Sequence, residues 1–170
     1  MLNWIQDHGA WNKGISSLNT KIMVKDRVRI RGRVRVTVRD TEGKLIEQRP
    51  WSSNLVTDAG EALFAALMGG ESVNPCTYCG VGGGSAQAQE TDTALGSELG
   101  RIEFTNTSRT GGTITFSTFW SIADAPGTWW EIGLFNAPTG GTLIARYVLD
   151  SSVSKSASNT VTVDYELQVA

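Results

Sequence analysis

The alternation of apolar and polar residues is clearest over residues 22–39, IMVKDRVRIRGRVRVTVR. Apolar side chains occupy even-numbered positions and arginines occupy odd-numbered ones. The apolar set is Val28, Ile30, Val34, Val36 and Val38, and the basic set is Arg27, Arg29, Arg31, Arg33, Arg35 and Arg39. A period of two is typical of a half-buried strand. Asp40-Thr41-Glu42-Gly43 then indicates a turn, and residues 44–51 a returning strand. Residues 21–51 are therefore predicted to form a basic hairpin.

A single helix is predicted over residues 57–70, TDAGEALFAALMGG, with its body at about 58–68. Asp58 is expected to cap it, because Glu61 follows at the spacing of a capping box. Gly69-Gly70 is expected to end it in the left-handed conformation that glycine adopts easily. One apolar face should pack on a sheet, since its members recur at helical spacing: Leu63, Phe64, Leu67 and Met68.

The remainder, residues 77–170, is predicted to be rich in β-strands. Glycine-rich turns at 109–112 and 138–141 separate apolar or alternating runs, which we place at 77–81, 102–107, 113–121, 129–135, 142–149 and 160–169. Short strands with turn signals and one helix favour an antiparallel β-sandwich or barrel with the helix packed on it. Residues 21–170 should therefore form one β domain.

Residues 1–20 show no clear period, yet they are too apolar for a solvated tail: Trp4, Ile5, Trp11, Ile15 and Leu18. We treat this stretch as an N-terminal arm. An arm that docks on a neighbouring subunit would explain its composition. A short helix packed on the chain's own domain would explain it equally well.

Charge is divided unevenly along the 170 residues. The net charge is −2, but residues 1–50 carry +6 and residues 51–170 carry −8. The split allows attraction between copies or partners, or neutralisation within one fold. Closely spaced arginines on one strand face repel one another, so we expect them to face the carboxylates of a partner subunit. Nucleic acid is not expected as a partner, because no aromatic residues interleave the arginines for base stacking.

Candidate chemistry is sparse. The only histidine is His8, and the Cys76–Cys79 pair is half of a zinc site, which usually has four ligands. The run Gly82–Gly84 lacks the Lys and Ser/Thr of a phosphate-binding loop, so we expect it to serve as a flexible loop. We predict a protein that is not an enzyme and has no catalytic residues, cofactor or metal.

No apolar run of about 18 residues is present, so no membrane span is expected. The N-terminus lacks a basic region followed by an apolar one, so no secretory signal is expected. Folding in a cytoplasm is the resulting expectation.

Four segments, in order, resemble the tail-collar type of N-terminal domain in tail fibres of tailed bacteriophages. They are a TxxG helix start at Thr57–Gly60, a VGxG strand at Val81–Gly84, a TxLxxExxR segment at Thr93–Arg101, and an EIGLF…LIA hairpin at Glu131–Ala145. The match covers about 90 residues. Within it, Glu131 and Arg101 are candidates for an ion pair across the sheet.

The resemblance implies a structural protein of the virion, made in the host cytoplasm, that assembles with itself, as a trimer, and with other virion proteins. A tail position, at fibre attachment or in the baseplate, is favoured. Capsid decoration by the same fold is one alternative. A carbohydrate-binding module that uses Trp129 and Trp130 beside Glu131 is another.

Contact residues for such assembly are predicted from charge and aromatic character. Adjacent Trp129 and Trp130 must point to opposite faces of their strand, so one belongs to the core and the other is exposed or at an interface, where tryptophan is enriched. The first 50 residues should make much of the contact. The interface candidates are Trp4, Trp11, Arg27, Arg29, Arg31, Arg33, Arg35, Trp129 and Trp130.

Overall fold

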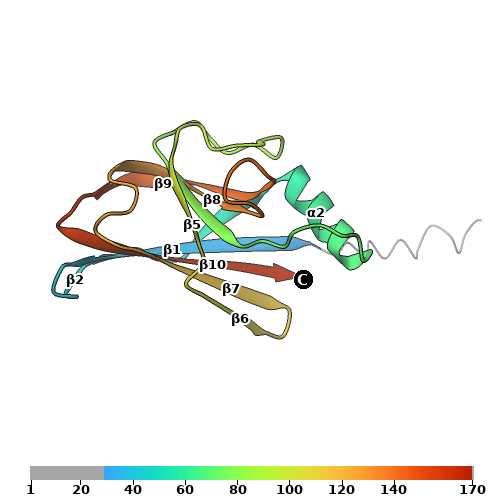
Figure 1. The fold of residues 1–170 in the computed structure, drawn as a ribbon, viewed down its shortest axis with the longest axis horizontal. Coiled ribbons are helices and arrows are strands. Elements are labelled where there is room, and N and C mark those ends of the chain that lie inside the picture. The colour runs from blue at the N-terminus through green and yellow to red at the C-terminus, as the bar shows by residue number, and fades with distance from the viewer. Residues whose placement is uncertain (1–28, 170) are drawn as a thin grey trace, which may run out of the picture.

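The computed structural model describes residues 29–169, and the predicted arm, with Trp4, Trp11 and Arg27, lies outside them. The described chain is mostly β-strand, with one helix between the third and fourth strands (Figure 1). In order, the elements are β1 (Ile30–Asp40), β2 (Leu45–Gln48), β3 (Ser52–Val56), α2 (Asp58–Met68), β4 (Tyr78–Gly82), β5 (Glu98–Glu103), β6 (Asn106–Thr110), β7 (Thr113–Trp120), β8 (Gly127–Phe135), β9 (Leu143–Lys155) and β10 (Asn159–Val169).

The strands form one curled antiparallel sheet in the order β5-β4-β8-β9-β3-β1-β10-β7-β6, with β2 paired to β1. Because β3 pairs with both β1 and β9, it joins two layers that face each other. The first layer holds β2, β1, β10, β7 and β6, and the second holds β9, β8, β4 and β5. The predicted fold class, an antiparallel β-sandwich or barrel with one short helix, is confirmed.

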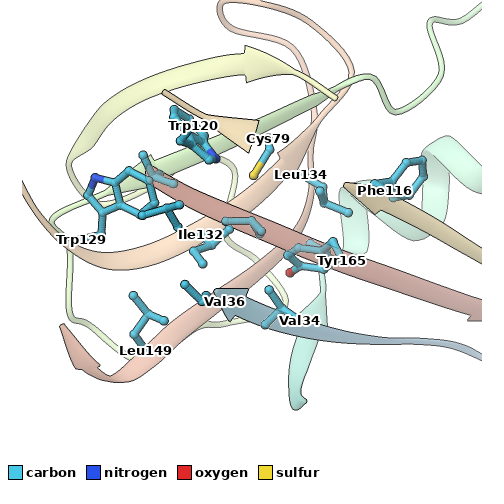
Figure 2. Packing of buried hydrophobic residues seen from close by; sticks show 14 of the residues in the cluster. Val34, Val36, Cys79, Phe116, Trp120, Trp129, Ile132, Leu134, Leu149 and Tyr165 are labelled. Carbon is cyan, nitrogen blue, oxygen red and sulfur yellow. The ribbon is translucent and has the colours of Figure 1, made fainter. Parts of the chain in front are cut away.

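The core lies between the two layers (Figure 2). Inward side chains of β1 and β10 meet those of β8 and β9, as alternation in strands requires. Fully buried members include Val34, Val36, Val163, Tyr165, Trp120, Trp129, Ile132 and Leu134. The alternating pattern of β1 therefore predicted its buried face correctly.

The predicted turn at 40–43 is present. The Asp40 carboxylate accepts hydrogen bonds from the backbone N–H groups of Glu42 and Lys44, and Gly43 has a φ of +84°. The returning strand predicted at 44–51 is present only as the shorter β2, and a further strand beyond that range, β3, also pairs with β1. Pro50 stands between them and has no N–H to donate to a ladder.

The helix has the predicted position but a different cap. Thr57, not Asp58, is the N-cap, and its hydroxyl oxygen accepts a hydrogen bond from the Gly60 N–H. The same hydroxyl donates to the Leu143 carbonyl at 2.6 Å, which fastens the helix start to β9. A Cβ on Gly60 would lie 2.2 Å from the Ile144 carbonyl oxygen, so glycine permits this close approach. In residues 29–169, no helix has the length and apolar character needed to cross a membrane.

The predicted apolar face of α2 is only partly used. Leu63 is buried, whereas Leu67 and Met68 are 39% and 75% exposed. The helix packs on β9 through the side that carries Gly60 and Leu63. The far end of its apolar face therefore lies open in the described part of the chain.

The long connection between β4 and β5, residues 83–97, lies over the outer face of the second layer. Leu95 from this loop forms a small second core with Phe135 and Leu143. The loop thus covers Phe135 and Leu143, which point away from the main core.

Candidate functional site

Glu131 is a fully buried carboxylate in the middle of β8. Its Oε1 accepts hydrogen bonds from the N–H groups of Gly84 (2.8 Å) and Ser97 (2.9 Å). Its Oε2 accepts from the Gly96 N–H (3.0 Å) and from Arg146 Nε (2.9 Å). One carboxylate therefore fastens both ends of the 83–97 loop to the sheet. We call Glu131, Arg146, Asp92 and these three amides the carboxylate clamp.

Arg146 completes the clamp from the neighbouring strand β9. It is 3% exposed, and its Nη2 lies 2.7 Å from Glu131 Oε2. Its Nη1 donates to Asp92 Oδ2 at 2.8 Å, and Asp92 also accepts from the Gln89 N–H. Burial by itself raises the pKa of Asp92, but the hydrogen bonds from Gln89 and Arg146 outweigh it and lower that pKa. Charge-assisted bonds thus hold the middle of the loop as well as its ends.

Two glycines are required beside the clamp for steric reasons. A Cβ on Gly82 or on Gly84 would lie 2.5 Å from Glu131 Oε1. Gly83, between them, has only ordinary contacts, with its nearest neighbour at 3.7 Å. The VGxG spacing therefore makes room for a buried carboxylate. The expectation that Gly82–Gly84 serves as a flexible loop is corrected, because Gly82 belongs to β4 and Gly84 is held by Glu131.

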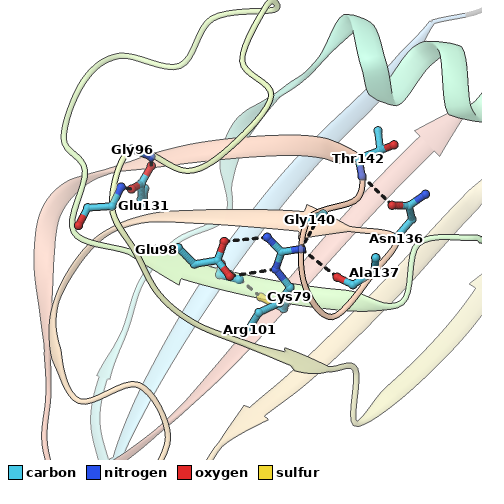
Figure 3. Close-up of polar contacts among 11 residues, drawn as sticks. Cys79, Gly96, Glu98, Arg101, Glu131, Asn136, Ala137, Gly140 and Thr142 are labelled. Carbon is cyan, nitrogen blue, oxygen red and sulfur yellow. Dashed lines mark hydrogen bonds and ion pairs between the residues drawn. The ribbon is translucent and has the colours of Figure 1, made fainter.

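Arg101 has a different partner from the one predicted. It pairs with Glu98 at 2.7 Å and not with Glu131, which pairs with Arg146. Its Nη1 donates to the carbonyls of Ala137 (2.8 Å) and Gly140 (2.7 Å) (Figure 3). Its guanidinium also lies over the Phe135 ring. Arg101 therefore fastens the β8–β9 turn to β5.

Two arginines on the outer face of β1 are paired with carboxylates of the same chain. Arg33 and Arg35 lie directly opposite Glu166 and Asp164 of β10 and form ion pairs with them. Both guanidinium groups also lie 4.7 Å from the ring centroid of Trp51. β10 therefore supplies carboxylates to these two arginines within one chain, and their expected contact with a partner subunit stays a prediction. Arg29 and Arg31 are exposed.

The tryptophan pair divides between core and surface as predicted. Trp129 is fully buried, packs edge-on against Trp120, and donates from Nε1 to the Ala125 carbonyl at 2.8 Å. Its role as an interface candidate is corrected, because within this chain it belongs to the core. Trp130 is half-buried, and the register of β8 against β9 shifts at this point. That bulge lets both Trp129 and Ile132 face the core.

The two cysteines are free thiols. Burial raises the pKa of the Cys79 thiol to about 12, and burial together with Cys79 raises that of Cys76. Both are therefore protonated near neutral pH, whereas metal binding and nucleophilic attack use the thiolate. Among residues 29–169, no group of three or more His, Cys, Asp or Glu side chains is placed to hold a metal ion. His8 lies outside the described residues.

Sequence reasoning missed Arg146, the principal partner of Glu131. A signal was present, because an arginine directly ends the apolar run of LIAR on the strand after EIGLF. A charge inside each of two neighbouring apolar strands indicates a buried pair, since lone charges are rarely buried. The partner of Glu131 depends on the register of β8 against β9, which the sequence does not specify.

The arrangement of the clamp suits a structural role, in which Glu131 holds the 83–97 loop on the sheet. Four donors from the chain itself occupy both oxygens of Glu131. No family model, curated protein or solved structure matches this chain in comparisons with known proteins.

Proposed function

We propose that this protein is a non-enzymatic structural component of a tailed-phage virion, which assembles with copies of itself and docks on neighbouring virion proteins. The tail, at fibre attachment or in the baseplate, is the favoured position. The proposal rests on the four motifs that resemble the tail-collar type and on what their residues do in the fold.

Each of the four motifs contributes a residue whose hydrogen bonds hold a loop or a helix end on the sheet, and this observation carries the proposal. Thr57 of TxxG caps α2 and bonds to β9, and Gly84 of VGxG donates to Glu131. Arg101 of TxLxxExxR holds the β8–β9 turn, and Glu131 of EIGLF anchors the loop. Residues far apart in the sequence thus act together to make the loops rigid, which is what a subunit that presents loops to other subunits requires.

The sheet also offers an edge for assembly. In the described chain, β6 ends the strand order and its five residues are all exposed. An exposed edge strand presents unpaired N–H and C=O groups to which another chain can add a strand. We propose a homo-oligomer, a trimer by family resemblance, with such an edge among its contacts.

The carbohydrate-binding alternative is less well supported. It needs aromatic faces and a carboxylate open to a sugar, whereas Trp129 and Glu131 are both fully buried. Trp130 alone does not form such a site.

The test uses purified particles of the virus that encodes the chain. Quantitative mass spectrometry should find the protein in fixed stoichiometry, and an antibody label imaged on the particle should mark the tail. Label over the capsid would support decoration in place of the tail position. Absence of the protein from purified particles would overturn the structural role altogether.

A further inference from the structure

An apolar groove of about 460 Å³ lies beside α2. The helix contributes Leu63, Phe64, Leu67 and Met68, and the facing strands contribute Ile114, Phe116 and Leu167. Its size falls within the range of protein sites that bind apolar ligands. Leu67 and Met68, which α2 does not bury on the sheet, form its exposed margin.

The groove is at the end of the molecule where the chain enters the fold. Figure 1 shows α2 at the same end as the start of β1 and the finish of β10. Ile30 opens β1 and pairs with Val169, and Gly32 pairs with the groove residue Leu167. The residues that precede Ile30 therefore join the domain close to the groove.

We infer that the groove binds the N-terminal arm, residues 1–20, of the same chain. The arm holds two of the six tryptophans of the protein, with Ile5, Ile15 and Leu18, and thus matches an apolar site. About 18 residues separate Trp11 from Arg29, and an extended chain covers up to about 3.6 Å per residue, so the arm can reach the groove.

The same chain is favoured over a neighbouring copy for a thermodynamic reason. A segment tethered near its site has an effective concentration on the order of millimolar, which a second copy in dilute solution does not approach. Docking would also remove the apolar surface of Leu67 and Met68 from water, which is favourable. The apolar composition of the arm is then explained by packing on its own domain and not by docking on a neighbouring subunit.

Disulfide trapping in the full chain tests the inference. Met68→Cys at the groove is combined in turn with Trp4→Cys, Trp11→Cys or Leu18→Cys, in a Cys76→Ser background that removes the half-buried native thiol. At least one pair should form an intramolecular disulfide under mild oxidation, at a rate independent of protein concentration. The matched control places the second cysteine at Gln168, an exposed residue of β10 that pairs with Arg31 and is therefore as close to the start of β1 as the groove is. Gln168 points to the opposite face of the strand from its neighbour Leu167, which lines the groove.

The inference predicts that trapping at position 68 is at least about ten-fold faster than at position 168, which corresponds to roughly 1.4 kcal/mol. Equal rates at both positions would overturn it. Disulfide-linked dimers that dominate, and that decrease on dilution, would also overturn it, because the occupant would then be a neighbouring copy's arm. Neither result bears on whether the protein is found in virions, so the proposed function is tested separately.

Limited proteolysis provides a second measurement without new cysteines. Leu67→Asp places a charge in the groove at a partly exposed site, so the fold should persist, as circular dichroism can verify. Release of the arm should speed tryptic cleavage after Lys13 by about ten-fold, since cleavage follows the population of the open form. Ile46→Asp should leave the rate unchanged. Equal cleavage rates in the wild type and in Leu67→Asp would contradict the inference.

Discussion

Two sets of arginine–carboxylate pairs stand on opposite layers of this protein. In the carboxylate clamp of the second layer, Arg146 and Glu131 are 3% and 0% exposed. On the outer face of the first layer, the Arg33 side chain is 54% exposed and its partner Glu166 is 17% exposed. Both pairs join an arginine to a glutamate, but Glu131 accepts four hydrogen bonds from the described chain and Glu166 accepts one.

Burial explains the difference. A buried charge left without partners is strongly unfavourable, so Glu131 has four donors and thereby fixes a long loop. An exposed pair is also solvated by water and contributes little to stability. The clamp therefore organises the structure, whereas the pairs on β1 and β10 mainly relieve repulsion among neighbouring arginines.

The largest effect is expected from Glu131→Gln. The substitution keeps the shape of the side chain but leaves the buried Arg146 with only Asp92 as an anionic partner. Breaking a buried pair by removing one partner typically costs about 3–5 kcal/mol. Urea unfolding should show that loss, while Glu166→Gln, the matched change on the exposed face, should stay below about 1 kcal/mol. Equal losses would show that burial does not distinguish the two regions.

Gly84→Ala should come next. Its Cβ would be 2.5 Å from Glu131 Oε1, so the loop must shift or the carboxylate must turn. A loss of about 1–3 kcal/mol in the free energy of unfolding is expected for such overpacking. Gly83→Ala adds the same methyl group one residue away, where the nearest atom is at 3.7 Å, and should change stability by about 0.5 kcal/mol or less. If the two variants are equally stable, the steric requirement at Gly84 is wrong.

A double-mutant cycle at Arg33 and Glu166 should give a small coupling. The single changes Arg33→Ala and Glu166→Ala and their combination isolate the pair, for which about 0–1 kcal/mol is expected. The coupling should shrink further as salt rises from 0.05 to about 0.5 M, because exposed charges are screened. A coupling of several kcal/mol that resists salt would place this pair in the same class as the clamp.

The smallest effect concerns acid pH. Because the pKa of Asp92 is lowered in the fold, its ionised form contributes stability that is present above its ordinary pKa of 3.8 and is lost as pH falls through the lower folded value. Unfolding free energy measured from pH 5 downward should therefore fall less steeply in Asp92→Asn than in the wild type. Parallel curves would show that Asp92 does not contribute to the acid sensitivity.

The comparison also shows which inferences the sequence supported. Alternation placed the core face of β1 correctly, because one side of a strand must be buried and the other need not be. The same alternation identified the arginine face, but it could not show that the opposing carboxylates lie on β10, about 130 residues further along the chain. The expectation of a partner subunit at Arg33 and Arg35 was drawn without that register.

By itself, the sequence determined most of the elements: the alternating strand β1, the glycine turns, the one helix and the fold class they imply. These depend on the local periods of apolar residues and on backbone conformations that glycine permits, and both are encoded over a few neighbouring residues. The strand expected at 102–107 instead covers the end of β5 and the start of β6, and the one expected at 142–149 is the first part of the longer β9. Only the tertiary structure decided the partners: Arg146 for Glu131, Glu98 for Arg101, Asp164 and Glu166 for the arginines of β1. Pairing across a sheet depends on strand order and register, which are set by the packing of the whole core and by no single segment.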